Sequence, residues 1–456
     1  MKISEVIRVT PPSDSPESAT ELCLPLTYSD LFWFKLPPVE RLFFYQLNEL
    51  TPACFNSVVL PKLKRSLSLT LLHYLPVAGN LKWPPDQPKP VVLYTANDGV
   101  PLTVAESSPD FNLLTSNGIH DAVELHPLKP ELIASDVSTS TVALQITLFP
   151  NMGFCIGITA HHAVLDGKTT TMFVKSWAHI CNHGNKDNST LPLELIPFFD
   201  RSVLKGPDGL DMLYLDQWLA LSGSDSNKKS LEITTSGGGA PDLVRATFEI
   251  TRDDLNKLRE RVLSVVPHSG KDLHLSTFVL SYAYVTTCMV KARGDGERRV
   301  LLGFTVDCRS RLNPPVPENY FGNCNRGIFQ VSKARDFLGE RGFVYAVQKV
   351  GEMVKGLTEK GVLDGIEKDL TIVFDVLKQM AESEIQIISV AGSPRFGVYG
   401  SDLGWGKPKK VVIVSIDKSE AFSMAESRDG GGGVEIGLAL KKNEMDKFSS
   451  LFLQHV

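Results

Sequence analysis

A histidine followed four residues later by an aspartate is the pair in this chain whose types and spacing could do chemistry. His162 and Asp166 lie in the run TAHHAVLDG at residues 159–167. Because an imidazole titrates near neutral pH, His162 could take a proton from a hydroxyl group while the carboxylate of Asp166 orders its surroundings. The pair alone is a weak indication, since many His-x-x-x-Asp pairs are structural.

The residues around the pair predict the elements that must position it. Apolar residues alternate over 142–148 and again over 154–158, and the Pro-Asn-Met-Gly run between them is typical of a hairpin turn. His161 and His162 therefore come at a strand end, with side chains that point in opposite directions. Apolar residues at helical spacing then predict a helix over 169–179. The pair thus occupies a strand-to-helix turn, where side chains are displayed at a cavity.

Composition excludes several classes of function. The 456 residues fit two domains of roughly 200 residues each. A net charge of -5 argues against a nucleic-acid partner held through its phosphates. No apolar run approaches the roughly 20 residues that span a membrane, and the first residues lack the character of a signal or transit peptide. We therefore expect a cytoplasmic protein that binds neither nucleic acid nor membranes.

A metal-dependent hydrolase is an alternative interpretation, with His161, His162 and Asp166 as ligands. Adjacent strand residues face apart, however, and no further cluster of His, Asp or Glu accompanies them. The seven cysteines are scattered without a Cys-x-x-Cys pair, which predicts reduced thiols. We expect no metal site.

The second half of the chain restarts after an irregular stretch. Residues 181–215 are polar and interrupted by Gly and Pro, which predicts a crossover between domains. A strand over 244–250 follows, and then a helix capped by Thr251 with Asp254 at the capping-box position. A helix over 276–291 is apolar on two faces and is expected to be buried. Further strands are expected over 411–416, 421–426 and 434–440.

Four short runs join the His-Asp pair: LPVAG at 75–79, DCRSR at 307–311, YFGNC at 320–324 and SDLGWGKP at 401–408. In this order, over nearly the whole length, they resemble the plant BAHD family of acyl-CoA-dependent acyltransferases. His-x-x-x-Asp-Gly and Asp-Phe-Gly-Trp-Gly are the signatures of that family, and here Leu403 takes the Phe place. Together with LPLTYSD at 24–30, YFGNC resembles the branch that acylates sugars of flavonoid, anthocyanin and other phenolic glycosides.

The resemblance implies an α/β (α+β) fold of two similar-sized domains, each related to chloramphenicol acetyltransferase. On this basis we expect an N-terminal domain over 1–190, a crossover loop over 191–215 and a C-terminal domain over 216–456. An active-site channel would run through their interface, with acyl-CoA entering from one face and a phenolic glycoside from the other. The co-substrate would be acyl-CoA, no cofactor would be bound permanently, and the protein would be a monomer.

By resemblance, His162 matches the catalytic base. A neutral imidazole that removes the acceptor proton during attack on the thioester would contribute a factor of roughly 10² to 10⁴. The CoA thiol then leaves, and no acyl-enzyme is required. The family implies that Asp166 turns away from the cavity and forms a salt bridge with an arginine, for which Arg309 and Arg311 are candidates. A role for Asp166 in orienting His162, as in a triad, is the alternative.

The second signature supplies the other residues that the resemblance points to. Asp402 belongs to it, and we expect a structural role for this residue. Gly404, Trp405 and Gly406 would support the CoA channel from a distance, because glycines permit a tight turn and Trp405 supplies apolar area.

Residues that could contact CoA lie in two places. Ser276 and Thr277 open the apolar helix and match a family position near the 3′-phosphate, although a simple N-cap is an equal alternative. Ser393 and Arg395 match a segment that lines the channel. Many hydroxycinnamoyl-using members have Trp where this chain has Ser393, so the smaller residue is compatible with a small acyl group.

The acyl donor is inferred from its charge. A malonyl group carries a carboxylate, which requires a cation or several hydrogen-bond donors. Some malonyl-using relatives place an Arg four residues after the motif Asp; here that position is Thr170, and the nearest cation is Lys168. Other malonyl-using relatives share the DGKTT run, so we favour malonyl-CoA. A p-coumaroyl or caffeoyl donor on the same acceptors and a non-catalytic binding protein with this fold are the alternatives.

Overall fold

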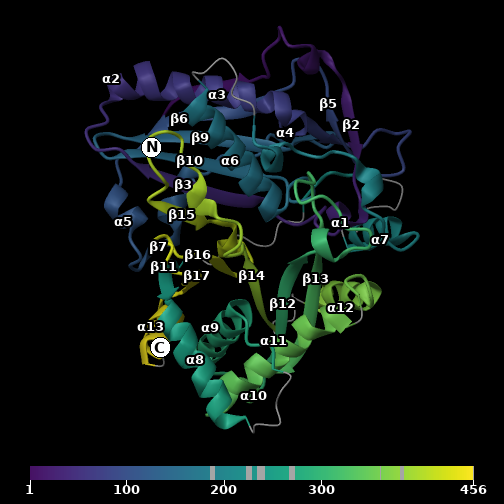
Figure 1. Cartoon of the computed structure of the whole chain (residues 1–456), viewed down its shortest axis with the longest axis vertical. Helices are drawn as coiled ribbons and strands as arrows, with labels where there is room; N and C mark the ends of the chain where they lie inside the picture. The colour runs from purple at the N-terminus through teal and green to yellow at the C-terminus, as the bar shows by residue number, and fades with distance from the viewer. Residues whose placement is uncertain are drawn as a thin grey trace.

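A computed structural model describes residues 1–184, 191–221, 229–233, 242–266, 273–359, 361–379 and 385–454. The described residues form two sheet-rich bodies, which lie one above the other in Figure 1. The upper body is built largely from the N-terminal half of the chain and the lower body from the C-terminal half. The predicted mixed α/β class is confirmed.

The upper body contains a six-stranded sheet within the described residues. Its order is β1 (Lys2–Val9), β6 (Val100–Glu106), β9 (Val142–Phe149), β10 (Gly153–Ala160), β3 (Val39–Gln46) and β15 (Lys410–Ile413). The β9–β10 hairpin occupies the middle of this sheet and pairs in antiparallel register from Gly153 with Phe149 to Ala160 with Val142. The predicted hairpin is therefore confirmed, and every residue of β10 is buried.

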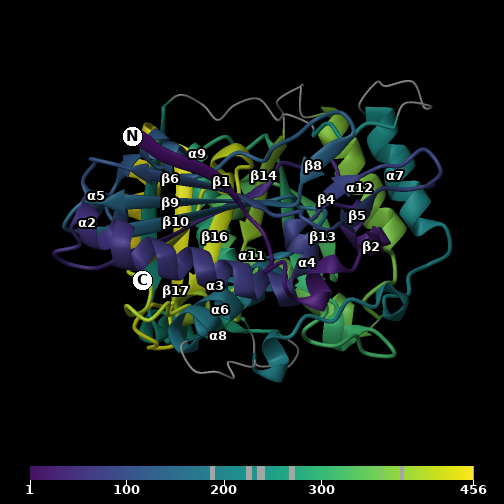
Figure 2. The same cartoon turned by 90° about the horizontal axis from the view of Figure 1, so that it is seen from above.

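Helices cover both faces of this sheet. Phe43 and Tyr45 of β3 join the core beneath helices α3 and α6, whereas Leu42 and Phe44 pack on the opposite face with Phe111 of α5, as the two-residue period of a strand requires. Figure 2 shows α3 running roughly along strands β9 and β10. The helices of this body are α1 (Tyr28–Leu31), α2 (Pro52–Cys54), α3 (Leu60–His73), α4 (Leu75–Ala78), α5 (Phe111–Thr115), α6 (Gly167–His183) and α7 (Leu210–Leu221). A small sheet beside them has the order β2 (Leu22–Pro25), β5 (Val91–Tyr94), β4 (Asn80–Lys82) and β8 (Ser138–Ser140).

The lower body contains a seven-stranded sheet within the described residues. Its order is β13 (Asn325–Lys333), β12 (Arg299–Asp307), β14 (Ile385–Ala391), β16 (Phe422–Glu426), β17 (Val434–Lys441), β11 (Leu243–Ile250) and β7 (His120–Asp121). Its helices are α8 (Arg252–Val265), α9 (Thr277–Arg293), α10 (Arg335–Leu338), α11 (Gly342–Glu359) and α13 (Lys442–Gln454), while α12 (Ile366–Gln379) packs against β13 and α7. The buried helix expected over 276–291 is α9, and α8 begins with the predicted capping box of Thr251 and Asp254.

The two bodies exchange strands. Strand β15, from the C-terminal half, pairs with β3 of the upper sheet, and β7, from the N-terminal half, pairs with β11 of the lower sheet. Each body therefore includes a segment of the other half of the chain. The domain boundaries near residues 190 and 215 stay a prediction.

The crossover differs from its predicted irregular form. Helix α6 continues to His183, and α7 begins at Leu210, inside the segment expected to lack periodicity. The α7 sequence LDMLYLDQWLAL is apolar around most of the helix, so it shows no single stripe that would reveal its period. Tyr214 and Trp218 are buried in the core of the upper body, and the Trp218 indole donates to the Leu31 carbonyl at 3.0 Å. Within the described ranges, no helix is both long and apolar enough to cross a membrane.

Candidate active site

The predicted strand-to-helix turn lies between β10 and α6. The His161 amide still donates to Thr141 of the hairpin at 2.8 Å, and the Val164 amide donates back to the His161 carbonyl at 2.9 Å. Asp166 is the N-cap of α6 and accepts from the Thr169 amide at 2.7 Å. The turn thus holds His162 at a strand end and Asp166 at a helix start.

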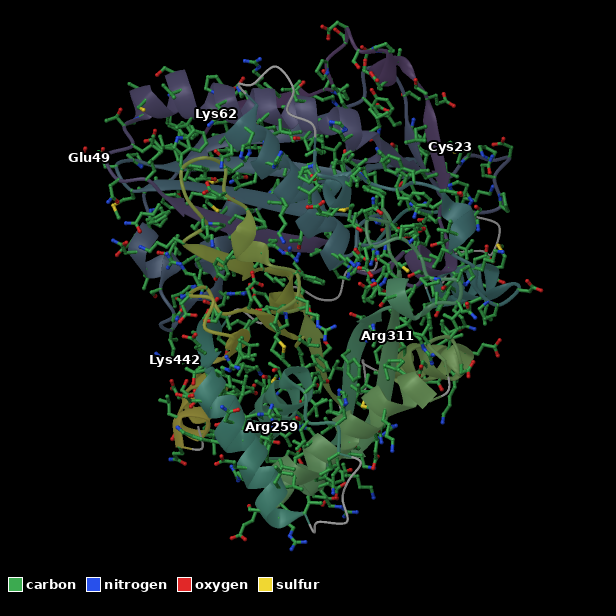
Figure 3. All side chains as sticks on the ribbon, viewed as in Figure 1. Cys23, Glu49, Lys62, Arg259, Arg311 and Lys442 are labelled. Atoms are coloured by element: carbon green, nitrogen blue, oxygen red, sulfur yellow. The ribbon has the colours of Figure 1, made fainter. Side chains whose placement is uncertain are left out.

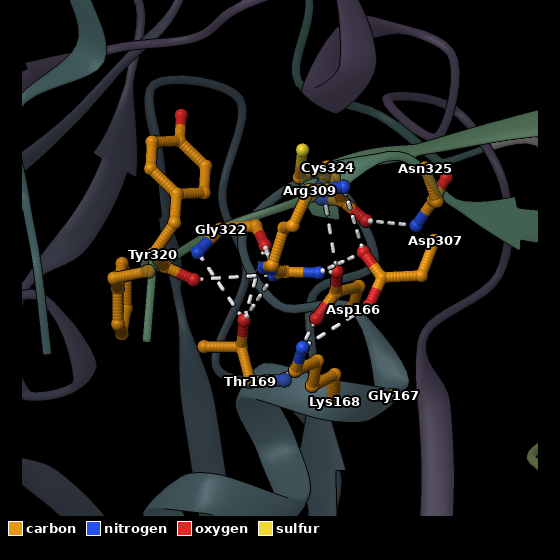
Figure 4. A network of polar contacts seen from close by, with 12 residues as sticks. Asp166, Gly167, Lys168, Thr169, Asp307, Arg309, Tyr320, Gly322, Cys324 and Asn325 are labelled. Atoms are coloured by element: carbon orange, nitrogen blue, oxygen red, sulfur yellow. Dashed lines mark hydrogen bonds and ion pairs between the residues drawn. The ribbon is translucent and has the colours of Figure 1, made fainter. Parts of the chain in front are cut away.

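The carboxylate of Asp166 pairs with Arg309, a buried residue of the short 3-10 helix η6 (Arg309–Arg311) with 1% of its surface exposed. The Arg309 Nη2 donates to Asp166 Oδ2 at 2.9 Å and to the carbonyls of Tyr320 and Gly322 at 3.1 and 3.0 Å. Figure 4 shows the guanidinium between these partners. Burial alone would lower the pKa of Arg309, but the charges of Asp166 and Asp307 outweigh it and raise that pKa.

Only one of the two candidate arginines makes this salt bridge. Arg311 is exposed and donates to the Asp307 carbonyl at 2.8 Å. Within the described residues, the Asp166 side chain has hydrogen-bond partners at Thr169, Arg309 and Cys324, and the His162 ring is not among them. Asp166 is therefore engaged away from the imidazole.

His162 is half-buried, and its ring lies flat against Trp33. The ring centroids are 3.9 Å apart with an interplanar angle of 4°, and the Asn323 side-chain amide donates to the His162 carbonyl at 2.9 Å. Its buried Nδ1 has no hydrogen-bond partner among the described residues. Burial penalises the imidazolium and lowers the pKa of His162 to about 4. The ring is therefore neutral at physiological pH and able to accept a proton.

His161 has a different environment from its neighbour. It is fully buried, and its Nδ1 accepts from the Ala163 amide at 3.2 Å. Burial lowers the pKa of His161 to about 3, so this ring is also neutral. Its side chain serves packing and the local turn.

The second signature forms a self-contained turn on the upper body. Asp402 Oδ1 accepts from the amides of Gly404 and Gly406 at 2.7 and 3.0 Å, and both glycines have φ near +97°, at +96° and +98°. Trp405 lies against Phe154, with Lys62 of α3 4.6 Å from its ring centroid. Figure 3 shows Lys62 at the top of the molecule and Arg311 near the boundary between the bodies.

The residues proposed to contact the donor divide into two groups. Ser276 is the N-cap of α9 and accepts from the Val279 amide at 3.3 Å, with Thr277 as the first helical residue. Ser393 accepts from the amide of the exposed Arg395 at 3.2 Å, in a turn that also brings Phe396 next to Gly167 at the start of α6. The structure therefore brings the 393–396 segment to the His-Asp turn.

Lys168, the cation nearest to the motif Asp, is already paired. Its Nζ lies 3.1 Å from Asp307 Oδ2 and also contacts Glu318. Within the described ranges, no group of three or more His, Cys, Asp or Glu side chains is arranged to hold a metal ion.

Comparison with known proteins identifies the family. The Transferase family matches residues 2–454. The chain belongs to this family. It is the BAHD family to which the motifs were likened, so the protein is an acyl-CoA-dependent acyltransferase that uses acyl-CoA as co-substrate.

Three relatives resemble this BAHD acyltransferase over nearly their whole length. Phenolic glucoside malonyltransferase 1 of Arabidopsis thaliana is 51% identical and covers 98% of this chain and 96% of its own. From the same organism, malonyl-CoA:anthocyanidin 5-O-glucoside-6''-O-malonyltransferase is 49% identical, with 99% and 97% covered, and agmatine coumaroyltransferase is 42% identical, with 100% and 99% covered. Among solved structures, vinorine synthase superposes with a TM-score of 0.70 at 20% identity, covering 100% of this chain and 98% of its own, which confirms the predicted fold.

Several residues around the site of this acyltransferase were missed by sequence reasoning. Trp33 and Asn323 contact His162. Asn323 belongs to the YFGNC run that the resemblance singles out, whereas no motif points to Trp33. Lys35 is 1% exposed, and its ammonium donates to the Ser230 and Glu232 carbonyls at 2.6 and 2.8 Å, which ties residues 229–233 to the upper body. Burial lowers the pKa of Lys35 to about 8. The signal available was a single lysine within the apolar run LFWFKLPP at 31–38.

A cavity of about 400 Å³ lies beside α1 in this BAHD acyltransferase. Its lining includes Thr27, Tyr28, Lys89, Arg201 and Asp211. None of the candidate site residues lines it. The active-site channel between the bodies stays a prediction.

Proposed function

We propose that this enzyme transfers a malonyl group from malonyl-CoA to a sugar hydroxyl of a phenolic glucoside, with His162 as the general base. The observation that carries the chemistry is the neutral, half-buried imidazole of His162 at the turn between β10 and α6. The substrates are inferred from the relatives named as malonyltransferases of phenolic and anthocyanidin glucosides, which are 51% and 49% identical.

In the proposed mechanism, His162 removes the acceptor proton as the hydroxyl oxygen attacks the thioester carbonyl. The new C–O bond forms while the C–S bond breaks, and the resulting imidazolium returns its proton to the CoA thiolate. A positioned base of this kind contributes roughly 10² to 10⁴ to the rate. No acyl-enzyme is formed, so the buried cysteines near the turn have no role in the reaction.

Asp166 acts as a positioning residue in this proposal. Its carboxylate is engaged by Arg309 and by the Thr169 amide, which holds the turn that carries His162. Asp402 holds a separate turn through the Gly404 and Gly406 amides. We therefore assign the proton transfer to His162 and structural roles to both aspartates.

The malonyl donor has support from size more than from charge. Ser393 lies in the turn that reaches the start of α6 through Phe396, and a small residue at this position is compatible with a small acyl group. Lys168 could bind the malonyl carboxylate only by exchanging its contacts with Asp307 and Glu318. We assign Arg395, Ser276 and Thr277 to CoA, as donors for its phosphates. We further propose, on composition and net charge, that the enzyme is cytoplasmic and binds neither nucleic acid nor membranes. On the family resemblance, we propose that it is a monomer.

A hydroxycinnamoyl donor is the second candidate. It is favoured by the 42% identity to a relative named agmatine coumaroyltransferase over 99% of that protein. The two candidates differ in the charge and length of the acyl group, so a donor panel distinguishes them.

The test is an assay of CoA release with malonyl-, acetyl- and p-coumaroyl-CoA against a panel of phenolic glucosides, with products identified by mass spectrometry. We expect malonylated glucosides, and we expect His162→Ala to lower kcat by about 10² to 10⁴. The matched control is His183→Ala, since His183 is exposed at the end of α6. Retained turnover in His162→Ala would overturn the mechanism, and products from p-coumaroyl-CoA alone would favour the second candidate.

A further inference from the structure

No other residue in the described part of the chain is hydrogen-bonded to Nδ1 of the His162 ring. In a triad, a third group hydrogen-bonded to the base fixes the orientation of the imidazole. Here Nδ1 has no partner among the described residues, and the carboxylate of Asp166 is engaged by Arg309. Since the χ2 torsion of histidine has broad minima, another contact must restrict the ring.

Trp33 supplies such a contact. Its ring stacks on the imidazole at 3.9 Å with an angle of 4°, so it covers one whole face of His162. The Trp33 indole is itself restricted, because its Nε1–H donates to Asn325 Oδ1 at 2.9 Å. The Phe32 ring lies edge-on against it at 4.8 Å. The plane of the indole, and with it the plane of the imidazole, is thereby set.

Asn325 and its neighbour Asn323 are held by the segment that contains Trp33. The Asn325 amide donates to Ser29 Oγ at 3.0 Å, and that hydroxyl donates to the Asn325 carbonyl at 2.9 Å. The backbone and side-chain amides of Asn323 donate to Asp30 Oδ1 at 3.0 and 3.1 Å. The same Asn323 side chain also donates to the His162 carbonyl.

Two sequence runs therefore converge on His162. The first is LPLTYSD at 24–30, which leads into Trp33, and the second is YFGNC at 320–324, which leads into Asn325. Asp30 is fully buried and is fixed by the capping box with Thr27 at the start of α1. The residues that contact His162 thus come from both halves of the chain.

We propose that Trp33, held by Asn325, is a positioning residue that sets the ring plane of His162 and excludes water from one face of it, while Asn323 fixes the His162 backbone. This inference rests on the proposed role of His162 as the base. It assigns to a stacking contact the task that a carboxylate performs in a triad.

The charged groups around the ring determine what removal of the indole does. Asp166 favours the imidazolium, the adjacent His161 is neutral, and Asp30 accepts from the Asn323 side chain that also donates to the His162 carbonyl. Burial outweighs the attraction of Asp166 and keeps the pKa of His162 low. A smaller side chain at position 33 would admit water, so the pKa of His162 would rise toward its ordinary value of 6.5.

The test compares Trp33→Leu, Trp33→Phe and Asn325→Leu with the control Trp83→Leu. Trp83 belongs to the same hydrophobic core and donates to the Gln87 carbonyl, but has no described contact with His162. We expect Trp33→Leu to lower kcat by about 10- to 100-fold, since a misplaced reacting group costs up to that much. The KM for acyl-CoA would change little, and the acidic limb of the kcat/KM profile would move to higher pH. Trp33→Phe would retain most of kcat, and Asn325→Leu would fall between the two.

The outcomes separate this inference from the proposed function. If His162→Ala keeps its turnover, the proposed function itself fails. If His162→Ala is inactive but Trp33→Leu matches Trp83→Leu in kcat and pH profile, only the positioning role of Trp33 is overturned. If Trp33→Leu does not fold, Asn325→Leu decides, and a wild-type kcat and pH profile in that variant would overturn the proposal.

Discussion

The two signatures of the chain both place a carboxylate in a turn that contains glycine. The two carboxylates differ in how far along the sequence their hydrogen-bond partners lie. Asp166 bonds to Arg309, which lies 143 residues away in the sequence, and to the Cys324 amide. Asp402 bonds to the amides of Gly404 and Gly406 in its own turn. The first signature therefore joins segments from both halves of the chain around His162, whereas the second stabilises a local loop. The two carboxylates thus differ in whether their partners are distant or local in the sequence.

The two turns also differ in burial, and therefore in how much free energy is lost when their contacts are broken. Arg309 and Asp166 are removed from water, with 1% and 6% of their side chains exposed, whereas Gly404 and Gly406 are exposed. Breaking a buried pair leaves an uncompensated charge in a poorly solvated site, whereas water replaces a lost hydrogen bond at the surface. Substitutions in the two turns test this difference, and the larger losses are expected in the buried turn.

The largest effect is expected for Asp166→Asn. Arg309 would lose its main buried counter-charge and keep only Asp307, so the free energy of unfolding should fall by about 3–5 kcal/mol, and activity should fall with it. Urea unfolding and CoA release measure the two losses. The control is Arg311→Leu, which removes an exposed arginine from the same short helix. Normal stability with a modest kinetic loss in Asp166→Asn would contradict the structural-bridge role.

An intermediate loss of stability is expected on acidification, and we expect it to arise from His161, which adjoins His162 in the first signature. The pKa of His161 is about 3 in the folded chain against 6.5 for an ordinary histidine, so the unfolded chain binds more protons between these values. The contribution of His161 to the free energy of unfolding should therefore be fully present above about pH 6.5. It should decrease on acidification, by roughly 2–4 kcal/mol. His161→Asn can still accept from the Ala163 amide but does not titrate. Urea unfolding from pH 4 to 7 should show a smaller slope in this variant, and an unchanged slope would count against the assignment.

The smallest effect is expected at Asp402. Asp402→Ala removes the acceptor of two exposed amides and should cost about 1 kcal/mol of unfolding free energy, with kcat within about threefold of the parent. Asp402→Asn retains an acceptor oxygen and serves as the matched variant, with a smaller loss. Thermal unfolding and the malonyl-CoA assay measure both. A hundredfold fall in kcat for Asp402→Asn would show that the second signature acts in the reaction.

The sequence by itself determined the local elements of the site. Alternating apolar residues predicted the β9–β10 hairpin, helical spacing predicted α6, and together they placed His162 at a strand end. The capping box at Thr251 and the buried α9 were also predictable, since such patterns depend on neighbours a few residues apart. Helix α7 escaped because its apolar residues surround most of its circumference.

Only the tertiary structure decided which distant residues meet at the turn. Arg309 and Arg311 share one short run, and the geometry of η6 buries the first while it exposes the second. The Trp33 ring stacks on the ring of His162, which is 129 residues away in the sequence. The Trp33 indole also donates to Asn325, which is 292 residues away in the sequence. Periodicity acts over a few residues and is readable in the sequence. The contact between Trp33 and His162 depends on how segments of the upper body pack, and the contact between Trp33 and Asn325 depends on how the two bodies pack. The orientation of the His162 ring is therefore a property of the folded chain.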